Sequence, residues 1–209
     1  MRGDVHVRFS ESAGVKFPRA THLVVGFQYK DDAVRFQAEL RERLREFNLS
    51  LNEDKTRLIE FGRFAHDNRR GRGGGKPETF NFLGFTHICG KTRRGKFCVL
   101  RQTMAKKKRA KLAALTKELR RRMHHRISDT GSWLRAVLTG HYQYYGVPRN
   151  GRALSAFRYH AYMLWQKMLK RRSQKNNRIT QEYMECLAKR WLPQPQITHP
   201  YPHERLRTS

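Results

Sequence analysis

Residues 104–123 read MAKKKRAKLAALTKELRRRM, and this stretch decides how the rest of the chain is interpreted. Leu112, Leu115, Leu119 and Met123 recur at intervals of three and four, which is the pattern of an α-helix with one narrow apolar stripe. Glycine and proline are absent, and Ala, Leu, Lys, Glu and Arg predominate, so helix propensity agrees with the spacing. We therefore predict a helix that buries its stripe against a neighbouring element.

Positive charge gathers at both ends of this predicted helix. The side chains that carry it are Lys106, Lys107, Lys108, Arg109 and Lys111 at one end and Arg120, Arg121 and Arg122 at the other. A single carboxylate, that of Glu118, lies among them, so the like charges repel one another unless an acidic partner binds. The alternative is a basic face that contacts only solvent. The excess of positive charge favours a surface that binds nucleic acid.

The composition of the whole chain points the same way. Its 209 residues carry 45 Lys and Arg against 17 Asp and Glu, a formal net charge of +28, and 38% of them are hydrophobic. Such a charge destabilises a compact chain unless counter-charge is bound, and the obvious polyanions are RNA, DNA or an anionic membrane. No apolar run of about 18 residues predicts a membrane span, and residues 1–12 lack a signal-peptide core, so we expect a cytoplasmic protein. Three cysteines are too few and too scattered for a disulfide framework.

We expect residues 1–22 to be weakly structured and residues 23–101 to form a small mixed α/β region. Apolar runs predict strands, an apolar face at helical spacing predicts one helix, and a glycine-rich stretch predicts a loop. In chain order these elements are strand Leu23–Phe27, helix Asp31–Phe47, strand Thr56–Phe61, loop Asn68–Lys76, and a hairpin of strands Phe80–His87 and Lys96–Arg101.

Residues 102–202 are predicted to be all-α, and residues 203–209 to be a tail. Prolines in the sequence WLPQPQITHPYP limit the last part of this region to extended chain. The expected fold class is therefore α+β, with a small mixed α/β N-terminal region followed by a helical bundle. The helices after the basic one are expected to begin near Ser128 or Asp129, after a cap at Asn150, and at Thr180.

Two groups of residues have the composition of a metal site. Residues Tyr29–Asp32 have the form Tyr-x-Asp-Asp of a polymerase motif, in which adjacent carboxylates hold divalent metals. These residues follow a strand and begin a helix. Acids are common at that position because the backbone N–H groups of the first turn stabilise their negative charge. His87, Cys89 and Cys98 lie on the predicted hairpin, but zinc normally takes a fourth ligand and closer pairs, so strand positions explain them better. We predict no catalytic residue, no metal site and no cofactor.

Basic clusters interleaved with aromatic side chains suit phosphate contacts and stacking on unpaired bases. The clusters cover residues 106–111, 120–126 and 170–178, and most of the aromatic residues between them are expected to lie in the core. Neutralising several phosphates gives an affinity that falls steeply with salt. The residues expected to bind RNA are Lys106, Lys107, Lys108, Arg109, Lys111, Arg120, Arg121, Arg122, Arg126, Tyr142, Lys170, Arg171, Arg172, Lys175 and Arg178.

Five stretches of the sequence have a recognisable order along the chain. They are LVVGFQ (residues 23–28), LREFNLSLNEDKTRLIEFGRFA (44–65), FNFLGFTHICGKTRRGKF (80–97), GSWLRAVLTGHYQYYGVP (131–148) and RWLPQPQITHP (190–200). Together they resemble the C-terminal part of bacterial group II intron reverse transcriptase/maturases, and the resemblance covers the chain from about residue 23 onward. It implies a remnant of the palm domain in residues 23–101, followed in residues 102–202 by a helical thumb, the maturase-specific domain that grips intron RNA.

The sequence departs from that family where the polymerase chemistry resides. In the family a Tyr-Ala-Asp-Asp motif precedes the LVVGF-like strand, whereas the same positions here are Arg19, Ala20, Thr21 and His22. The fingers and the earlier palm are missing as well. The resemblance therefore implies a truncated chain without the carboxylates that stabilise charge in phosphoryl transfer.

We expect a maturase-like RNA-binding protein of a mobile genetic element, which recognises group II intron RNA and assists its splicing. One alternative is a fragment or subunit of a split RNA-directed DNA polymerase, and this alternative keeps an enzymatic role open. A non-specific basic nucleic-acid-binding protein and a decayed gene remnant are two others. The expected partner is structured RNA and not a membrane, with a second copy of the chain or a separate fingers–palm chain as the protein partner.

Overall fold

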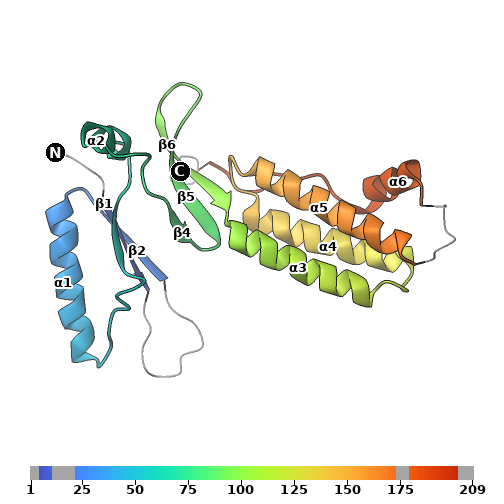
Figure 1. Ribbon diagram of the computed structural model, residues 1–209, viewed down its shortest axis with the longest axis horizontal. Helices are drawn as coiled ribbons and strands as arrows, with labels where there is room; N and C mark the ends of the chain where they lie inside the picture. The colour runs from blue at the N-terminus through green and yellow to red at the C-terminus, as the bar shows by residue number, and fades with distance from the viewer. Residues whose placement is uncertain (1–4, 11–21, 173–178, 202–209) are drawn as a thin grey trace, which may run out of the picture. The chain divides into compact units, whose positions relative to one another are not determined.

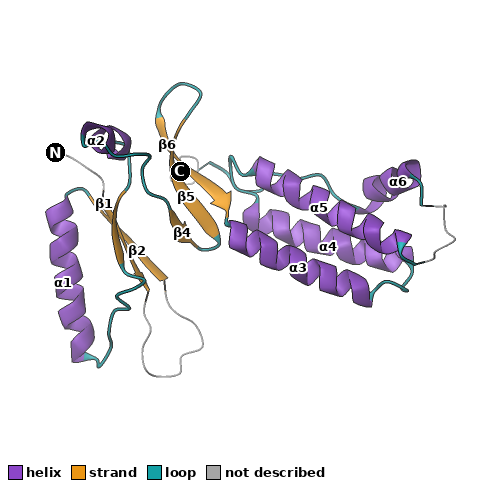
Figure 2. Ribbon diagram, viewed as in Figure 1, coloured by secondary structure: helices purple, strands orange, loops and turns teal. Residues whose placement is uncertain are grey.

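The computed structural model describes residues 5–10, 22–172 and 179–201, and it divides the chain into two compact units, Met1–Leu100 and Arg101–Ser209 (Figure 1). The division lies one residue before the boundary expected from the sequence. Figure 2 shows the strands in the first part of the chain and helices joined by loops in the rest; the last strand, Phe97–Thr103, runs on into the second unit. The predicted α+β class, with a helical C-terminal part, is confirmed. None of the helices in the described ranges has an apolar stretch long enough to cross a membrane.

The first sheet is antiparallel and has the strand order β2-β1-β3. Its strands are β1 (Val5–Ser10), β2 (His22–Phe27) and β3 (Arg57–Glu60). In the register of the sheet, Val7 lies opposite Val25 on one side and Leu58 on the other. The expectation that residues 1–22 are weakly structured is therefore wrong for β1, which is the central strand. The sequence VHVRF alternates with the period of a strand, but over too few residues to stand out from an irregular segment.

Helix α1 (Lys30–Glu46) packs on this sheet and forms the core of the first unit with it. Ala33 and Leu44 are buried on the apolar face of the helix. The helix begins one residue earlier than expected, and Asp31 and Asp32 lie in its first turn as predicted. Arg35 forms an ion pair with Asp32 at 2.7 Å, so these acids belong to a helix terminus.

Helix α2 (Ala65–Gly71) corrects the expectation of a loop at Asn68–Lys76. Its first turn contains Asp67, and its last turn contains arginines, so the charges at both ends complement the helix macrodipole. The predicted loop therefore holds only for the residues that follow the helix, because Asn68–Gly71 form its last turn. The chain leaves the helix at Gly73, where a φ of 71° suits a residue without a Cβ.

The second sheet has the order β4-β5-β6. Its strands are β4 (Phe80–Phe82), β5 (Phe85–Lys91) and β6 (Phe97–Thr103). The single strand expected at Phe80–His87 is broken because Leu83 and Gly84 take φ values of 47° and 78°, as in a two-residue type I′ hairpin turn. The hairpin expected between Phe80–His87 and Lys96–Arg101 is present as β5 and β6. Its turn spans residues 92–96, where the Thr92 N–H donates to the Lys96 carbonyl at 2.7 Å.

Four helices build the second unit around one apolar core. They are α3 (Ala105–Arg121), α4 (Ile127–Tyr145), α5 (Gly151–Lys170) and α6 (Gln181–Trp191). Helix α3 packs on α5, and α4 contacts both α5 and α6. The helix predicted to open at Thr180 is confirmed; Thr180 is its N-cap, and the Thr180 hydroxyl accepts a hydrogen bond from the Tyr183 N–H at 3.2 Å. The largest fully buried side chains of this unit are Leu119, Leu134, Leu138, Asn150, Leu154, Phe157, Trp165, Met184 and Leu192.

Asn150 occupies the N-cap position of α5 as expected, but its side chain does not cap that helix. It is 1% exposed and joins two other segments. Its Oδ1 accepts the Thr103 N–H at 3.0 Å, and its Nδ2 donates to the Thr103 hydroxyl and to the Tyr145 carbonyl, both at 2.8 Å. Asn150 therefore fixes the residue that leads into α3 against the last residue of α4.

The extended chain after α6 lies along α4 and α5. The Arg158 guanidinium donates to the carbonyls of Leu192 and Pro193 at 3.2–3.3 Å. The backbone N–H groups of Thr198 and His199 donate to the Gly146 carbonyl at 2.8 and 3.0 Å. The last two bonds satisfy the carbonyl group of Gly146, the C-cap residue of α4, which has no partner within the helix.

Candidate nucleic-acid interface

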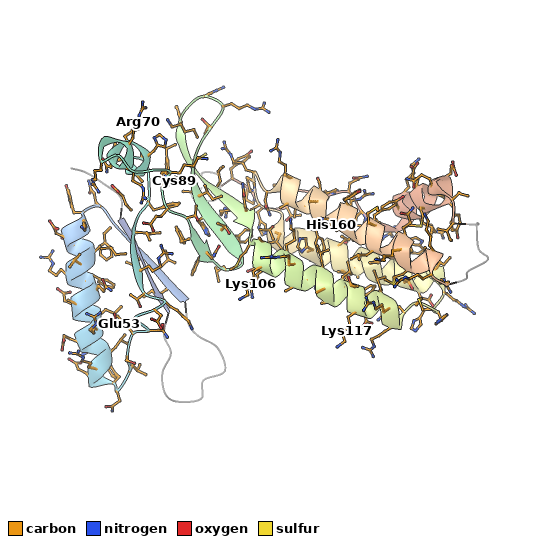
Figure 3. All side chains as sticks on the ribbon, viewed as in Figure 1. Glu53, Arg70, Cys89, Lys106, Lys117 and His160 are labelled. Carbon is orange, nitrogen blue, oxygen red and sulfur yellow. The ribbon has the colours of Figure 1, made fainter. Side chains whose placement is uncertain are left out.

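Helix α3 buries the apolar stripe that the sequence predicts. Leu115 and Leu119 are 3% and 1% exposed, and Leu112 packs against the same core. Lys106, Lys107, Arg109 and Lys111 are exposed, and no ion pair joins any of the four to a carboxylate in the described ranges. Figure 3 labels Lys106 near the first turn of α3 and Lys117 towards its other end.

The first turn of α3 is unusual because its charges have the same sign as the helix terminus. It contains no acidic residue, and the N-cap residue, Met104, provides no side-chain hydrogen bond. The N-terminal end of a helix carries a partial positive charge from its unpaired N–H groups, so lysines there are unfavourable and anions are favourable. Helix α1 shows the common arrangement, with Asp31 and Asp32 in its first turn. The start of α3 therefore attracts anions through both its side chains and its backbone.

The C-terminal end of α3 is partly neutralised. Glu118 accepts a hydrogen bond from Arg122 Nε at 2.7 Å and lies 3.4 Å from Arg121. The Arg122 guanidinium also lies 4.8 Å from the centre of the Trp133 ring, which is a cation–π contact. Arg122 is half-buried and acts as a packing residue, whereas Arg120 and Arg121 are exposed.

The other predicted RNA-binding cations divide by their surroundings. Arg126, Lys170 and Arg171 are exposed. Arg172 is half-buried and donates to the His125 carbonyl at 2.9 Å, so it ties the end of α5 to the loop between α3 and α4. Lys108 is half-buried as well. Lys175 and Arg178 lie outside the described residues.

Tyr142 does not belong to an exposed surface, and its prediction as an RNA-binding residue is wrong. The side chain is 4% exposed and lies in the apolar core of the helical unit. Its hydroxyl donates to the Pro193 carbonyl at 3.1 Å, which fixes the extended chain after α6. Burial raises the pKa of this hydroxyl to about 12, although the Arg158 charge lowers it. Tyr144, two residues further along the helix, is 51% exposed.

A groove of about 680 Å³ separates α3 from α4 in the helical unit. Lys107 and Lys111 line it from α3, and Tyr144 and Tyr145 line it from the last turn of α4. The sequence analysis did not identify this groove. Its signal is a pair of small residues four positions apart on each helix, and these residues are Ala110 and Ala114 on α3 and Ala136 and Gly140 on α4.

His141 also lines the groove, although the side chain is 6% exposed. Its ring stacks on Phe157 with 3.8 Å between the ring centroids and lies 4.6 Å from the Tyr145 ring. Its Nε2 is buried and has no hydrogen-bond partner in the described part of the chain. Burial, and then the positive charge of Lys111, lower the pKa of His141 from 6.5 to about 4, so the ring is neutral at pH 7.

His87 and Cys89, which the sequence analysis considered as metal ligands, make other contacts. The His87 ring stacks on Phe80 with a centroid separation of 4.7 Å. The sulfur of Cys89 accepts the Gly62 N–H at 3.4 Å, and burial raises the pKa of its thiol. Within the described residues, no group of three or more His, Cys, Asp or Glu side chains is placed to hold a metal ion. Three of the four positions aligned with Tyr-Ala-Asp-Asp, residues 19–21, lie outside the described ranges.

Comparison with known proteins shows that no protein-family model matches the chain and that no curated protein matches its sequence. The function is therefore inferred from the cationic surface of the helical unit and from the resemblance in the sequence.

Proposed function

We propose that the helical unit binds structured RNA, and that the protein is a maturase-like protein that recognises group II intron RNA without a polymerase site of its own. The observation that carries the RNA-binding part is the start of α3. Lys106, Lys107, Arg109 and Lys111 are exposed there, and none has a carboxylate partner in the described ranges. RNA phosphates would supply the negative charge that this surface lacks.

The energetics of the helix support this assignment. A charge placed favourably at a helix terminus is worth about 0.3–1 kcal/mol at an exposed site, and the opposite sign costs a similar amount. Lysines 106–108 follow Ala105, the first residue of α3, so their charges add to the positive end of the helix. An isolated helix would be more stable with acids at these positions, as in α1. A bound phosphate turns the same arrangement from a cost into a gain.

The cationic surface is also held in a fixed position. Leu115 and Leu119 anchor α3 in the core, and Asn150 holds the residue that leads into the helix. Because one turn of helix takes 3.6 residues, Lys107 and Lys111 lie one above the other on the groove side. A row of cations on an ordered helix suits a backbone with regularly spaced phosphates, because the protein backbone does not have to become ordered on binding.

The choice of intron RNA as the target rests on the sequence. The five stretches that resemble group II intron reverse transcriptase/maturases occur in the same order as in that family, and the helical unit contains the last two. The acids that resemble a polymerase motif, Asp31 and Asp32, lie in the first turn of α1 beside Arg35. No observation favours template-directed polymerisation, so a second function is not proposed.

The proposal is tested by removing the unpaired cations and measuring how RNA binding depends on salt. The variant carries Lys106→Gln, Lys107→Gln, Arg109→Gln and Lys111→Gln. Because the slope of log K against log salt is about −0.7 to −0.9 per phosphate contact, loss of all four contacts makes the slope shallower by about 3. Filter binding to a group II intron transcript, across a salt series, measures both slopes.

A matched control removes the same number of charges from α1. Its four arginines each form an ion pair with a carboxylate at 2.6–2.8 Å. The carboxylates offset their positive charge, so these arginines attract a phosphate less strongly. The control variant should keep the slope of the natural protein. Equal slopes for both variants would show that only net charge matters, and they would count against α3 as the RNA-binding surface. The control substitutions are Arg35→Gln, Arg41→Gln, Arg43→Gln and Arg45→Gln.

A further inference from the structure

The groove between α3 and α4 combines three features that a flat basic surface does not need. Cations line one wall through Lys107 and Lys111, aromatic rings line the other through Tyr144 and Tyr145, and three alanines and a glycine are among the residues that complete the lining. Its volume of about 680 Å³ falls within the range of about 300–1,000 Å³ that is common for small-ligand sites in proteins.

Gly140 keeps this groove open. It lies inside α4, where a glycine costs about 0.5–1 kcal/mol of helix stability relative to alanine. A Cβ added at this position would meet no atom within 4 Å, so no close approach of a neighbour requires a glycine here. Gly131, in the same helix, has such a requirement, because a Cβ there would lie 2.6–2.8 Å from the Trp191 ring. The packing of the helical unit therefore explains Gly131 and leaves Gly140 unexplained.

The aromatic rings and cations around the groove suit the base and the phosphates of one nucleotide. Tyr144 is 51% exposed, and its ring meets Tyr145 edge-on at 4.7 Å between the centroids, so the pair presents an aromatic surface to the groove. Stacking on an aromatic ring requires an unpaired base, because paired bases are already stacked in a helix. Lys107 and Lys111 supply positive charge on the opposite wall, at the distance of one helical turn from each other.

We propose that this groove receives the base of one unpaired ribonucleotide, with its neighbouring phosphates bound by Lys107 and Lys111. The proposal rests on the RNA-binding function proposed above and adds a preference to it: RNA with a bulged or unpaired base binds more tightly than a fully paired helix.

The test compares two RNA probes on the full chain. One is an RNA duplex with a single bulged adenosine, and the other is the same duplex without the bulge. The natural protein should bind the bulged duplex at least about fivefold more tightly, since stacking one base on an aromatic side chain contributes at least that much. Equal affinities for the two probes would overturn the proposal while leaving RNA binding itself intact. Failure to bind either probe at low salt would instead overturn the proposed function together with it.

Gly140→Leu fills the groove without removing any charge. It should abolish the preference for the bulge and leave the affinity for the paired duplex, and its salt slope, unchanged. The matched control is Ala113→Leu, which adds the same side chain at an exposed position of α3 outside the groove and should keep the preference. A second variant, Tyr144→Ala, removes the stacking surface and should lose the preference even if Gly140→Leu does not fold. Retention of the preference in a folded Gly140→Leu variant, or in Tyr144→Ala, would overturn the proposal.

Discussion

Replacing Asn150 with alanine should destabilise the helical unit by about 2–4 kcal/mol. The substitution removes three hydrogen bonds of 2.8–3.0 Å from a side chain that is 1% exposed. The Thr103 N–H loses the Asn150 acceptor, which costs about 1–3 kcal/mol, and each of the other two bonds is worth about 0.5–1.5 kcal/mol. We expect the lower half of the summed range of about 2–6 kcal/mol, because the Tyr145 carbonyl keeps its bond from the Val147 N–H at 2.8 Å.

Urea unfolding followed by tryptophan fluorescence measures this loss in the full chain. All three tryptophans lie in the helical unit, at positions 133, 165 and 191, so the signal reports on that unit alone. The control is Gln166→Ala, which removes one exposed side-chain bond of 3.4 Å to Gln181 and should change stability by less than about 0.5 kcal/mol. A loss below about 1 kcal/mol for Asn150→Ala would refute the role assigned to these bonds.

Three further changes test the packing beneath the surface. Tyr142→Phe should lower the free energy of unfolding by about 1 kcal/mol, because it removes one hydrogen bond, and it should leave RNA affinity unchanged. Weaker RNA binding by a stably folded variant would show that Tyr142 does belong to the RNA-binding surface. Gly131→Ala should lower the free energy of unfolding by about 1–3 kcal/mol, because its Cβ would meet the Trp191 ring, whereas Gly140→Ala should raise it by about 0.5–1 kcal/mol. Urea midpoints that shift in the same direction for both variants would contradict this contrast. Between pH 6.5 and 4 the unfolded chain binds a proton at His141 that the folded chain does not, so acidification should remove up to about 3 kcal/mol of stability. A His141→Gln variant should lack this part of the pH dependence, and identical stability profiles from pH 7 to 4 would contradict it.

Local patterns predicted those parts of the fold that depend on neighbours in the sequence. The apolar stripe of α3, the acids in the first turn of α1 and the start of α6 at Thr180 are all set within one or two helical turns. The class of the fold follows from the order of these elements. Strand β1 was missed because its alternation is short, and it becomes recognisable as a strand only when β2 and β3 pair with it.

The candidate site was predicted less completely, because periodicity does not distinguish a buried aromatic residue from an exposed one at the edge of an apolar face. Tyr142 and Tyr144 are two residues apart in one helix, yet the first is 4% exposed and the second 51%. Arg122 and Arg120 show the same limit for cations, because the contacts of Arg122 with Glu118 and a tryptophan require the folded bundle. Composition located the basic clusters, and tertiary packing decided which of their members remain exposed.

We propose above all that the protein binds RNA through a cationic surface on its helical bundle. The most direct measurement is filter binding of the purified full chain to a group II intron transcript across a salt series, with random RNA of equal length as competitor. We predict that log K falls linearly with log salt with a slope of about −3 or steeper, and that random RNA competes poorly. A slope near zero, or no binding at low salt, would contradict the account, and equal competition by random RNA would contradict the choice of intron RNA.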